Sequence, residues 1–272
     1  MTSNSKSIGI IFLSSGRGVY LNASIRSLLS SKVRLFDHEV HVVSNFGHSD
    51  LAFLNRKYPQ ICIHSISDTT HAGLVKYAFD LGTKYEYCFF VEEDWLFSRE
   101  LTDQDLNKLT EIQGVRQVVF SKYRLGHEEE DASAWGCARS TNIASLSNEA
   151  LILERYFSLN PTLIRKNVLR YICDNFDFSQ PNNSGPHLEM NLNSHLGEEF
   201  GPSILIPMES KFKVIHLGLM TATRNIRFNS QNRGGYAKNL MRLHVFLLGL
   251  KNSSNFLRRI YIPNRLTRFL ED

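Results

Sequence analysis

Residues 88–95 read CFFVEEDW, an apolar run that ends in three consecutive carboxylates. The run predicts a strand over Tyr87–Val91 that is covered on both faces, because none of its positions carries a charge. Adjacent acids at the end of a buried strand repel one another and lose hydration unless a cation neutralises them. A divalent metal explains the triplet, and its hard oxygen ligands suit Mg2+ or Mn2+. The alternative is a solvated acidic turn that opens the next helix.

The chain before this strand alternates between strand and helix patterns. Strands are predicted at residues 8–13, 39–43 and 61–66, and helices at 51–58 and 72–81, with a further helix after the first strand. This alternation predicts an open, mostly parallel sheet wound by right-handed crossovers. Ligands on such sheets bind beyond the carboxyl ends of the strands. We therefore expect function in the loops at residues 14–18, 44–50, 67–73 and 92–95.

The second half continues the same domain with longer insertions. It predicts a helix at residues 103–112, a strand at 117–121, an irregular polar segment through Trp135, a strand at 151–153 and a helix at 161–173. Another short apolar strand, 212–215, ends at His216. Because no composition shift separates the two halves, a second module is not expected.

Composition excludes several classes. The 272 residues carry 31 Lys and Arg against 27 Asp and Glu, a formal charge of +4 that does not demand a nucleic-acid partner. GxGxxG, Walker A and G-x-S-x-G motifs are absent from the sequence, which disfavours dehydrogenases, P-loop kinases and α/β-hydrolases. The four cysteines lack disulfide or zinc spacing, and the apolar run at residues 8–13 is too short to span a bilayer. These features predict a cytoplasmic protein.

The ordered set of motifs resembles the GT-A glycosyltransferases, especially family 2-like members. The triplet Glu92-Glu93-Asp94 resembles their DxD motif in the form E-[DE]-D. Three later segments resemble the family in the same order: YFSLNPTLIR at 156–165, HLEMNL at 187–192 and KVIHLG at 213–218. The resemblance covers residues 8–225 approximately. It implies a GT-A, Rossmann-like domain over residues 1–235, with a nucleotide-binding half at about 1–100 and an acceptor half at about 101–235.

The resemblance also implies roles for the acidic and histidine side chains. Asp94 would be the direct ligand of Mn2+ or Mg2+, with support from His216. Glu92 and Glu93 would contact the metal or the sugar. Glu189 would be the catalytic base of an inverting transfer, with Glu198 as a competitor for that role.

The donor site departs from the usual family pattern. The first loop reads Ser14-Ser15-Gly16-Arg17, and its hydroxyl groups and guanidinium suit a nucleotide diphosphate, although Arg17 also fits a surface loop. Lys76 either faces the diphosphate or points into solvent from its helix. The second strand ends in Ser44-Asn45, where the family usually has Asp residues that read the nucleobase.

The resemblance implies a metal-dependent enzyme that moves a sugar from a UDP- or GDP-linked donor to a hydroxyl of a glycan or lipid-linked acceptor, in cell-surface polysaccharide or glycan synthesis. Two alternatives stay open: a sugar-phosphate nucleotidyltransferase, and a non-catalytic carbohydrate-binding protein with the same fold. Metal-dependent nucleotide binding distinguishes the transferase from the binding protein.

The C-terminal residues 236–272 have apolar positions at helical spacing, and residues 251–272 carry five cations against two acids, a local charge of +3. This predicts a basic amphipathic helical extension. It either rests on the anionic inner face of a membrane or packs on its own domain or on a second subunit of a homodimer.

Overall fold

The structure is a computed structural model, and its compact first unit spans Met1–Leu217. Several features predicted from the sequence lie outside the described residues. They are the domain end at residue 235, the extension at 236–272, the polar segment at 121–137, Arg17 and Glu198. The described residues are 7–15, 18–31, 38–45, 48–66, 69–97, 101–120, 138–143, 148–159, 161–183, 186–197, 199–206 and 214–216.

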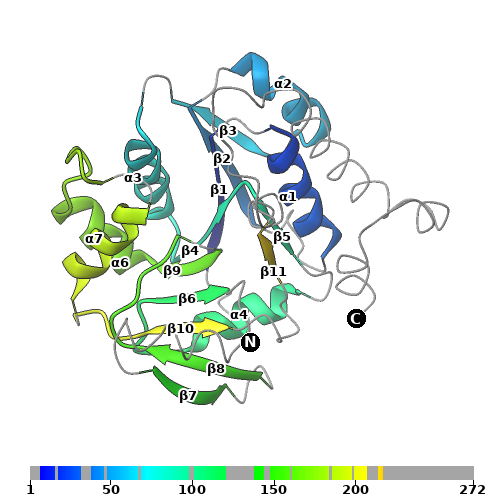
Figure 1. The fold of residues 1–272 in the computed structure, drawn as a ribbon. Coiled ribbons are helices and arrows are strands. Elements are labelled where there is room, and N and C mark those ends of the chain that lie inside the picture. Colours follow the sequence, from blue (N-terminus) through cyan, green and yellow to red (C-terminus); the bar gives the residue numbers. More distant parts are fainter. Residues whose placement is uncertain are drawn as a thin grey trace, which may run out of the picture. The chain divides into compact units, whose positions relative to one another are not determined.

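The first half alternates strand and helix as predicted (Figure 1). Its strands pair in parallel in the order β3-β2-β1-β4. The elements are β1 (Ile8–Ser14), α1 (Gly18–Ser30), β2 (Glu39–Ser44), α2 (His48–Lys57), β3 (Cys62–Ser65), α3 (His71–Gly82) and β4 (Tyr87–Glu92). The parallel sheet and its flanking helices are therefore confirmed here.

The second half extends the same sheet by antiparallel pairs and by one parallel pair, that of β6 with β10. The full strand order is β3-β2-β1-β4-β9-β6-β10-β8-β7. A separate two-stranded sheet joins β5 to β11. The elements are β5 (Trp95–Phe97), α4 (Asp103–Glu111), β6 (Gln117–Phe120), β7 (Ala138–Ile143), β8 (Asn148–Leu153), β9 (Thr162–Arg165), α6 (Lys166–Asn175), α7 (Pro186–Leu196), β10 (Ser203–Ile206) and β11 (Val214–His216).

The helix predicted over residues 161–173 is wrong at its beginning. Residues Thr162–Arg165 form β9, which pairs antiparallel with both β4 and β6, and the helix starts only at Lys166. Leu163 packs into the core on one face of the sheet and Ile164 into the core on the other. A short apolar run that is buried on both faces has no period that distinguishes strand from helix, so the sequence pattern alone did not separate them.

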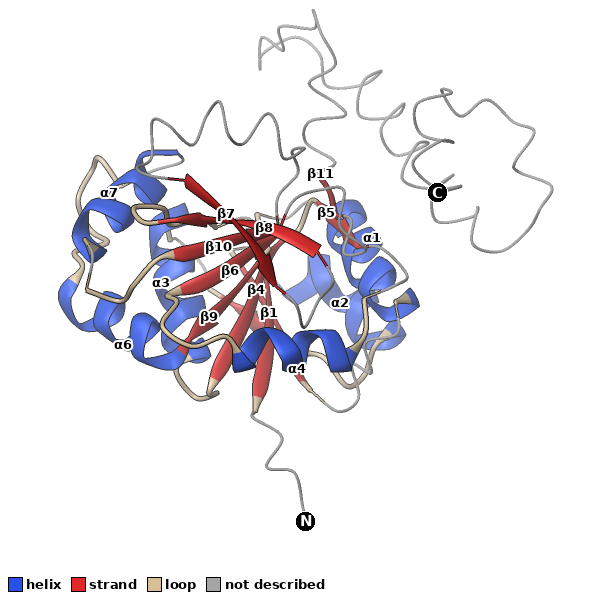
Figure 2. Ribbon diagram, turned by 90° about the horizontal axis from the view of Figure 1, so that it is seen from below, coloured by secondary structure: helices blue, strands red, loops and turns tan. Residues whose placement is uncertain are grey.

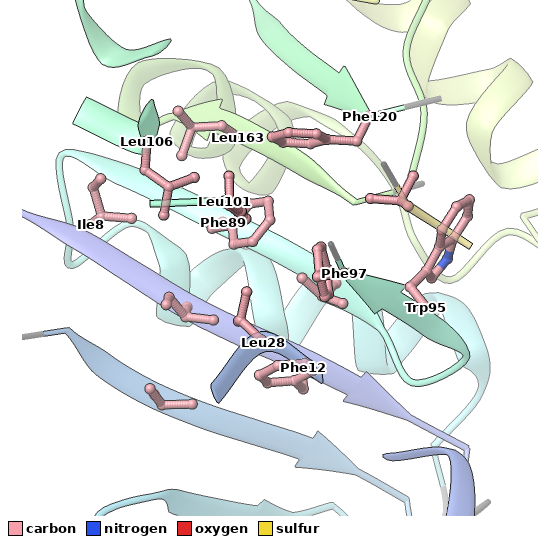
Figure 3. Packing of buried hydrophobic residues seen from close by; sticks show 14 of the residues in the cluster. Ile8, Phe12, Leu28, Phe89, Trp95, Phe97, Leu101, Leu106, Phe120 and Leu163 are labelled. Atoms are coloured by element: carbon pink, nitrogen blue, oxygen red, sulfur yellow. The ribbon is translucent and has the colours of Figure 1, made fainter. Parts of the chain in front are cut away.

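The core lies on both faces of the large sheet, since successive strand residues point to opposite sides. On one face Phe12 of β1 packs with Leu28 of α1, and this cluster extends through Phe89 and Phe97 to Trp95 (Figure 3). On the other face Ile11 and Leu13 of β1 belong to the cluster with α3, α6 and α7. Figure 2 shows α3, α6 and α7 on one side of the sheet and α1 and α2 on the other.

Within the described part of the chain, no helix is both long and apolar enough to cross a bilayer.

Candidate functional site

The carboxyl ends of the parallel strands form one polar edge. Ser14 at the end of β1 lies in register with Ser44 of β2, and Ser44 lies in register with Ser65 of β3. On the other side of β1, Leu13 is in register with Glu92, the last residue of β4. The loops expected to carry function therefore leave the sheet together, with the acidic triplet beside the serines of β1.

Glu93 bonds directly to both serines at the end of β1. The Ser14 hydroxyl donates to Oε2 of Glu93 at 2.5 Å, and the Ser15 hydroxyl donates to Oε1 at 2.6 Å. Ser14 is 0% exposed and Glu93 is 1% exposed, whereas Ser15 is exposed. The structure thus brings together three of the predicted donor-site residues, and it buries two of them.

Glu92 faces a histidine that the sequence analysis did not select. Its Oε1 lies 3.9 Å from Nε2 of His71, and both side chains are about one-third exposed. His71 is the first residue of α3, directly after the N-cap Thr70, whose hydroxyl accepts from the Gly73 amide. Burial lowers the pKa of His71, which favours the neutral imidazole. The only sequence signal for His71 was its place in the loop at residues 67–73.

Asp94 is 5% exposed and lies between β4 and β5. The short strand β11 pairs antiparallel with β5, and His216 is in register with Trp95. The backbone of His216 is therefore next to the residue that follows Asp94, although the two are far apart in sequence. Only the backbone of His216 is described.

Glu189 lies in the first turn of α7 and holds the loop that leads into β9. Its Oε1 accepts from the Ser158 hydroxyl at 2.9 Å and from the Leu159 amide at 2.5 Å. Because β9 starts with Thr162 in register with Phe90, this loop reaches the sheet beside the carboxyl end of β4. The fold thus connects Glu189 to the edge that carries the acidic triplet.

Lys76 is bonded within its own helix. Its ammonium donates to Oδ2 of Asp80 at 2.7 Å, one helical turn further on, and both side chains are exposed. This hydrogen bond raises the pKa of Lys76, so the side chain stays charged. In the structure its carboxylate partner is Asp80, and not the acidic triplet.

Solved structures share this architecture at low sequence identity. S. aureus TarS (residues 1–349) has a TM-score of 0.52 and 10% identity, over 97% of this chain and 77% of that one. The mannosyltransferase PcManGT from Pyrobaculum calidifontis, in complex with GDP-Man and Mn2+, has a TM-score of 0.53 and 12% identity, over 99% and 69% of the two chains. The chain has the GT-A fold.

GalNAc-T7, solved with UDP, GalNAc and Mn2+, has the same GT-A fold, with a TM-score of 0.53 and 7% identity over 79% of this chain and 44% of that one. TarS in complex with UDP-GlcNAc matches over 76% of this chain and 58% of that one. The sequence matches no protein-family model and no curated protein.

A divalent metal fits the donor atoms at this edge of the GT-A domain. Glu92 and Asp94, which precede and follow Glu93 in the sequence, supply hard carboxylate oxygens. Glu93 itself accepts hydrogen bonds from Ser14 and Ser15. Among the described residues, no group of three or more His, Cys, Asp or Glu side chains forms a ready-made cage. Mg2+ and its close analogues take one or two protein carboxylates and complete their shell with phosphate oxygens and water. Two carboxylates therefore suffice for a metal that arrives with a nucleotide diphosphate.

Proposed function

We propose that this chain is a metal-dependent glycosyltransferase that moves a sugar from a nucleotide-diphosphate donor to a hydroxyl acceptor, with inversion. The observation that carries the proposal is the acidic triplet at the end of β4 in a GT-A fold, next to the serines of β1. The ligands of three neighbours agree with it: UDP-GlcNAc in TarS, UDP, GalNAc and Mn2+ in GalNAc-T7, and GDP-Man and Mn2+ in PcManGT.

We assign the donor to the edge formed by β1 and β4. Asp94 and Glu92 would hold Mn2+ or Mg2+ there, and His216, whose backbone pairs with Trp95, would support the metal. When bound, the metal supplies positive charge that stabilises the leaving diphosphate. Ser15 and Arg17 contact the donor from the β1 loop, and His71 faces the carboxylate of Glu92. Lys76 reaches the diphosphate only if it leaves Asp80.

Glu189 removes the proton from the acceptor hydroxyl as that oxygen attacks the anomeric carbon from the face opposite the diphosphate. The hydrogen bonds from Ser158 and Leu159 fix its carboxylate and so reduce the reorganisation needed for proton transfer. Inversion follows from a single displacement. The acceptor is a hydroxyl group of a glycan or of a lipid-linked molecule in cell-surface polysaccharide synthesis. The protein binds it at the inner face of a membrane or acts on it as a homodimer.

Calorimetry with UDP and GDP, with and without Mn2+, followed by a screen of nucleotide sugars for hydrolysis, tests the proposal. We expect Mn2+-dependent binding of one nucleotide, and loss of binding and hydrolysis in Asp94→Ala. Asp174→Ala, which removes an exposed carboxylate at the end of α6, is the matched control. Full activity in Asp94→Ala contradicts the proposal. Release of pyrophosphate from a nucleoside triphosphate indicates a nucleotidyltransferase, and sugar binding without nucleotide or metal indicates a binding protein.

A further inference from the structure

The three acids of the triplet have different surroundings, although they are consecutive in sequence. Glu92 is partly exposed beside His71, and Asp94 precedes the short strand that pairs with β11. Glu93 turns instead toward β1, where both of its oxygens accept hydroxyl hydrogen bonds. We propose that Glu93 is a positioning residue, which fixes the Ser14–Ser15 turn against the end of β4 while Glu92 and Asp94 face the metal and the donor. This inference rests on the proposed function.

Burial makes this contact a strong constraint. A carboxylate that is 1% exposed cannot keep its hydration, so its negative charge depends on hydrogen bonds from the protein. Each of its two oxygens accepts from a serine hydroxyl, and hydrogen bonds to an ionised acceptor are about twice as strong as neutral ones. Because Ser14 is 0% exposed, water cannot replace its hydroxyl.

The contact links two segments that both leave the carboxyl edge of the sheet. Leu13 and Glu92 are paired in the sheet, and the Ser14–Glu93 bond extends this register by one residue beyond the last pair. The Ser14–Ser15 turn therefore keeps a fixed position relative to Glu92 and Asp94. A donor needs this fixed position, since its diphosphate must reach the Ser14–Ser15 turn and the metal at the same time.

The chemistry of glutamine separates positioning from metal ligation. Glu93→Gln keeps one acceptor oxygen for one serine, and its NH2 group donates to the other serine, whose hydroxyl turns to accept. This variant preserves the geometry of the turn and removes the charge. Glu93→Ala removes both serine hydrogen bonds, whereas Ser14→Ala removes only the buried one, from Ser14 to Glu93. A metal ligand loses much of its affinity for Mn2+ when Gln replaces Glu, because the amide oxygen is uncharged, whereas a positioning residue tolerates Gln.

The experiment measures the binding of Mn2+ alone by electron paramagnetic resonance, and of UDP and GDP with Mn2+ by calorimetry. We expect Glu93→Gln to keep both affinities within about threefold of the unmodified protein. Glu93→Ala and Ser14→Ala should each weaken nucleotide binding about tenfold, which equals roughly 1.4 kcal/mol. Their effects should not multiply in the double variant, because Glu93→Ala already removes the Ser14–Glu93 hydrogen bond.

Ser179→Ala is the matched control, because Ser179 also donates to a carboxylate, that of Asp177, at an exposed site between α6 and α7. It should leave nucleotide binding unchanged. Thermal unfolding of every variant separates loss of the turn from loss of the fold. Loss of Mn2+ binding in Glu93→Gln, or unchanged nucleotide binding in Glu93→Ala, overturns the inference alone. Absence of nucleotide binding in the unmodified protein overturns the proposed function, and this inference with it.

Discussion

Lowering the pH from 7.5 to 5 should destabilise the protein, because the fold favours the neutral form of His41 in β2. The Tyr85 hydroxyl donates to Oε2 of Glu39 at 2.5 Å and must therefore accept from Nε2 of His41, also at 2.5 Å. Nδ1 of His41 then accepts from Nε2 of His64 at 3.0 Å, and Nδ1 of His64 accepts from the Tyr77 hydroxyl at 3.2 Å. The tautomers of His41 and His64 both follow from the direction of the Tyr85 hydrogen bond to Glu39, because each later donor in the chain is fixed by the one before it.

A proton added to His41 goes to Nδ1 and places its N–H face to face with the N–H of His64. A proton added to His64 goes to Nδ1, where the N–H faces the Tyr77 hydroxyl. Burial, and after it the charge of His64, lower the pKa of His41. Burial, and after it Lys84, lower the pKa of His64. Glu39 opposes the shift of His41 only partly. In both cases the folded state favours the neutral ring more than the unfolded chain does.

The sign follows from proton linkage. A histidine with a lowered pKa binds fewer protons when folded, so its stabilising contribution is complete above the unfolded pKa of about 6.5 and falls as the pH drops below it. His41 is 5% exposed, and if it stays neutral down to pH 5 the free energy of unfolding falls by about 2 kcal/mol at that pH. This value is the upper limit of the loss in unfolding free energy that His41 alone can cause at pH 5.

Urea denaturation at pH 7.5, 6 and 5 measures this loss. His41→Gln should flatten the pH dependence, because glutamine still donates to Tyr85 but does not titrate. His187→Gln, at an exposed position in α7, should leave it unchanged. An equal fall in stability for His41→Gln and the unmodified protein would refute the reasoning.

Three further predictions follow from named contacts. Arg116 is fully buried and donates to the carbonyls of Gly201, Gly197 and Glu154, so Arg116→Met should lower the free energy of unfolding by about 3 kcal/mol in urea denaturation. Gly9→Ala should lower the melting temperature, since its added Cβ would lie 2.1 Å from the Tyr85 ring, whereas Gly114→Ala would meet no atom within 4 Å and should show only the cost of its positive φ. Glu189→Gln should abolish transfer and leave nucleotide affinity within about threefold, as measured by calorimetry and product assay; retained transfer contradicts its role as the base.

The sequence predicted the elements whose pattern is long or alternates clearly. The apolar run of β4 and the strand–helix rhythm from β1 to α3 placed the acidic triplet at the carboxyl edge, and the GT-A fold confirms that architecture. The short strands β5 and β10 were not predicted, because three or four apolar residues define no period. The strand β9 was included in a helix for the same reason.

The contacts of the site needed the register of the sheet. Ser14 and Glu93 are 79 residues apart, and nothing local in either segment indicates that they bond. His71 is a single histidine at a helix start, which carries no pattern of its own. The sequence allows Lys76 to face either the diphosphate or solvent, and its partner Asp80 lies four residues further on, the ordinary spacing for an ion pair on one helix face. Residue types indicated the chemistry, and three-dimensional pairing decided which residues meet.

The position of β9 has a consequence for biosynthesis. This strand separates β4 from β6 in the sheet, although both are translated before it. While a ribosome has released only the residues before Thr162, β4 and β6 each present an unpaired edge, and such edges readily join those of other nascent chains. The middle of the sheet closes only when β9 enters between two strands that are already made, which gives folding a late, non-local step. Fragments that end before residue 162 should therefore aggregate.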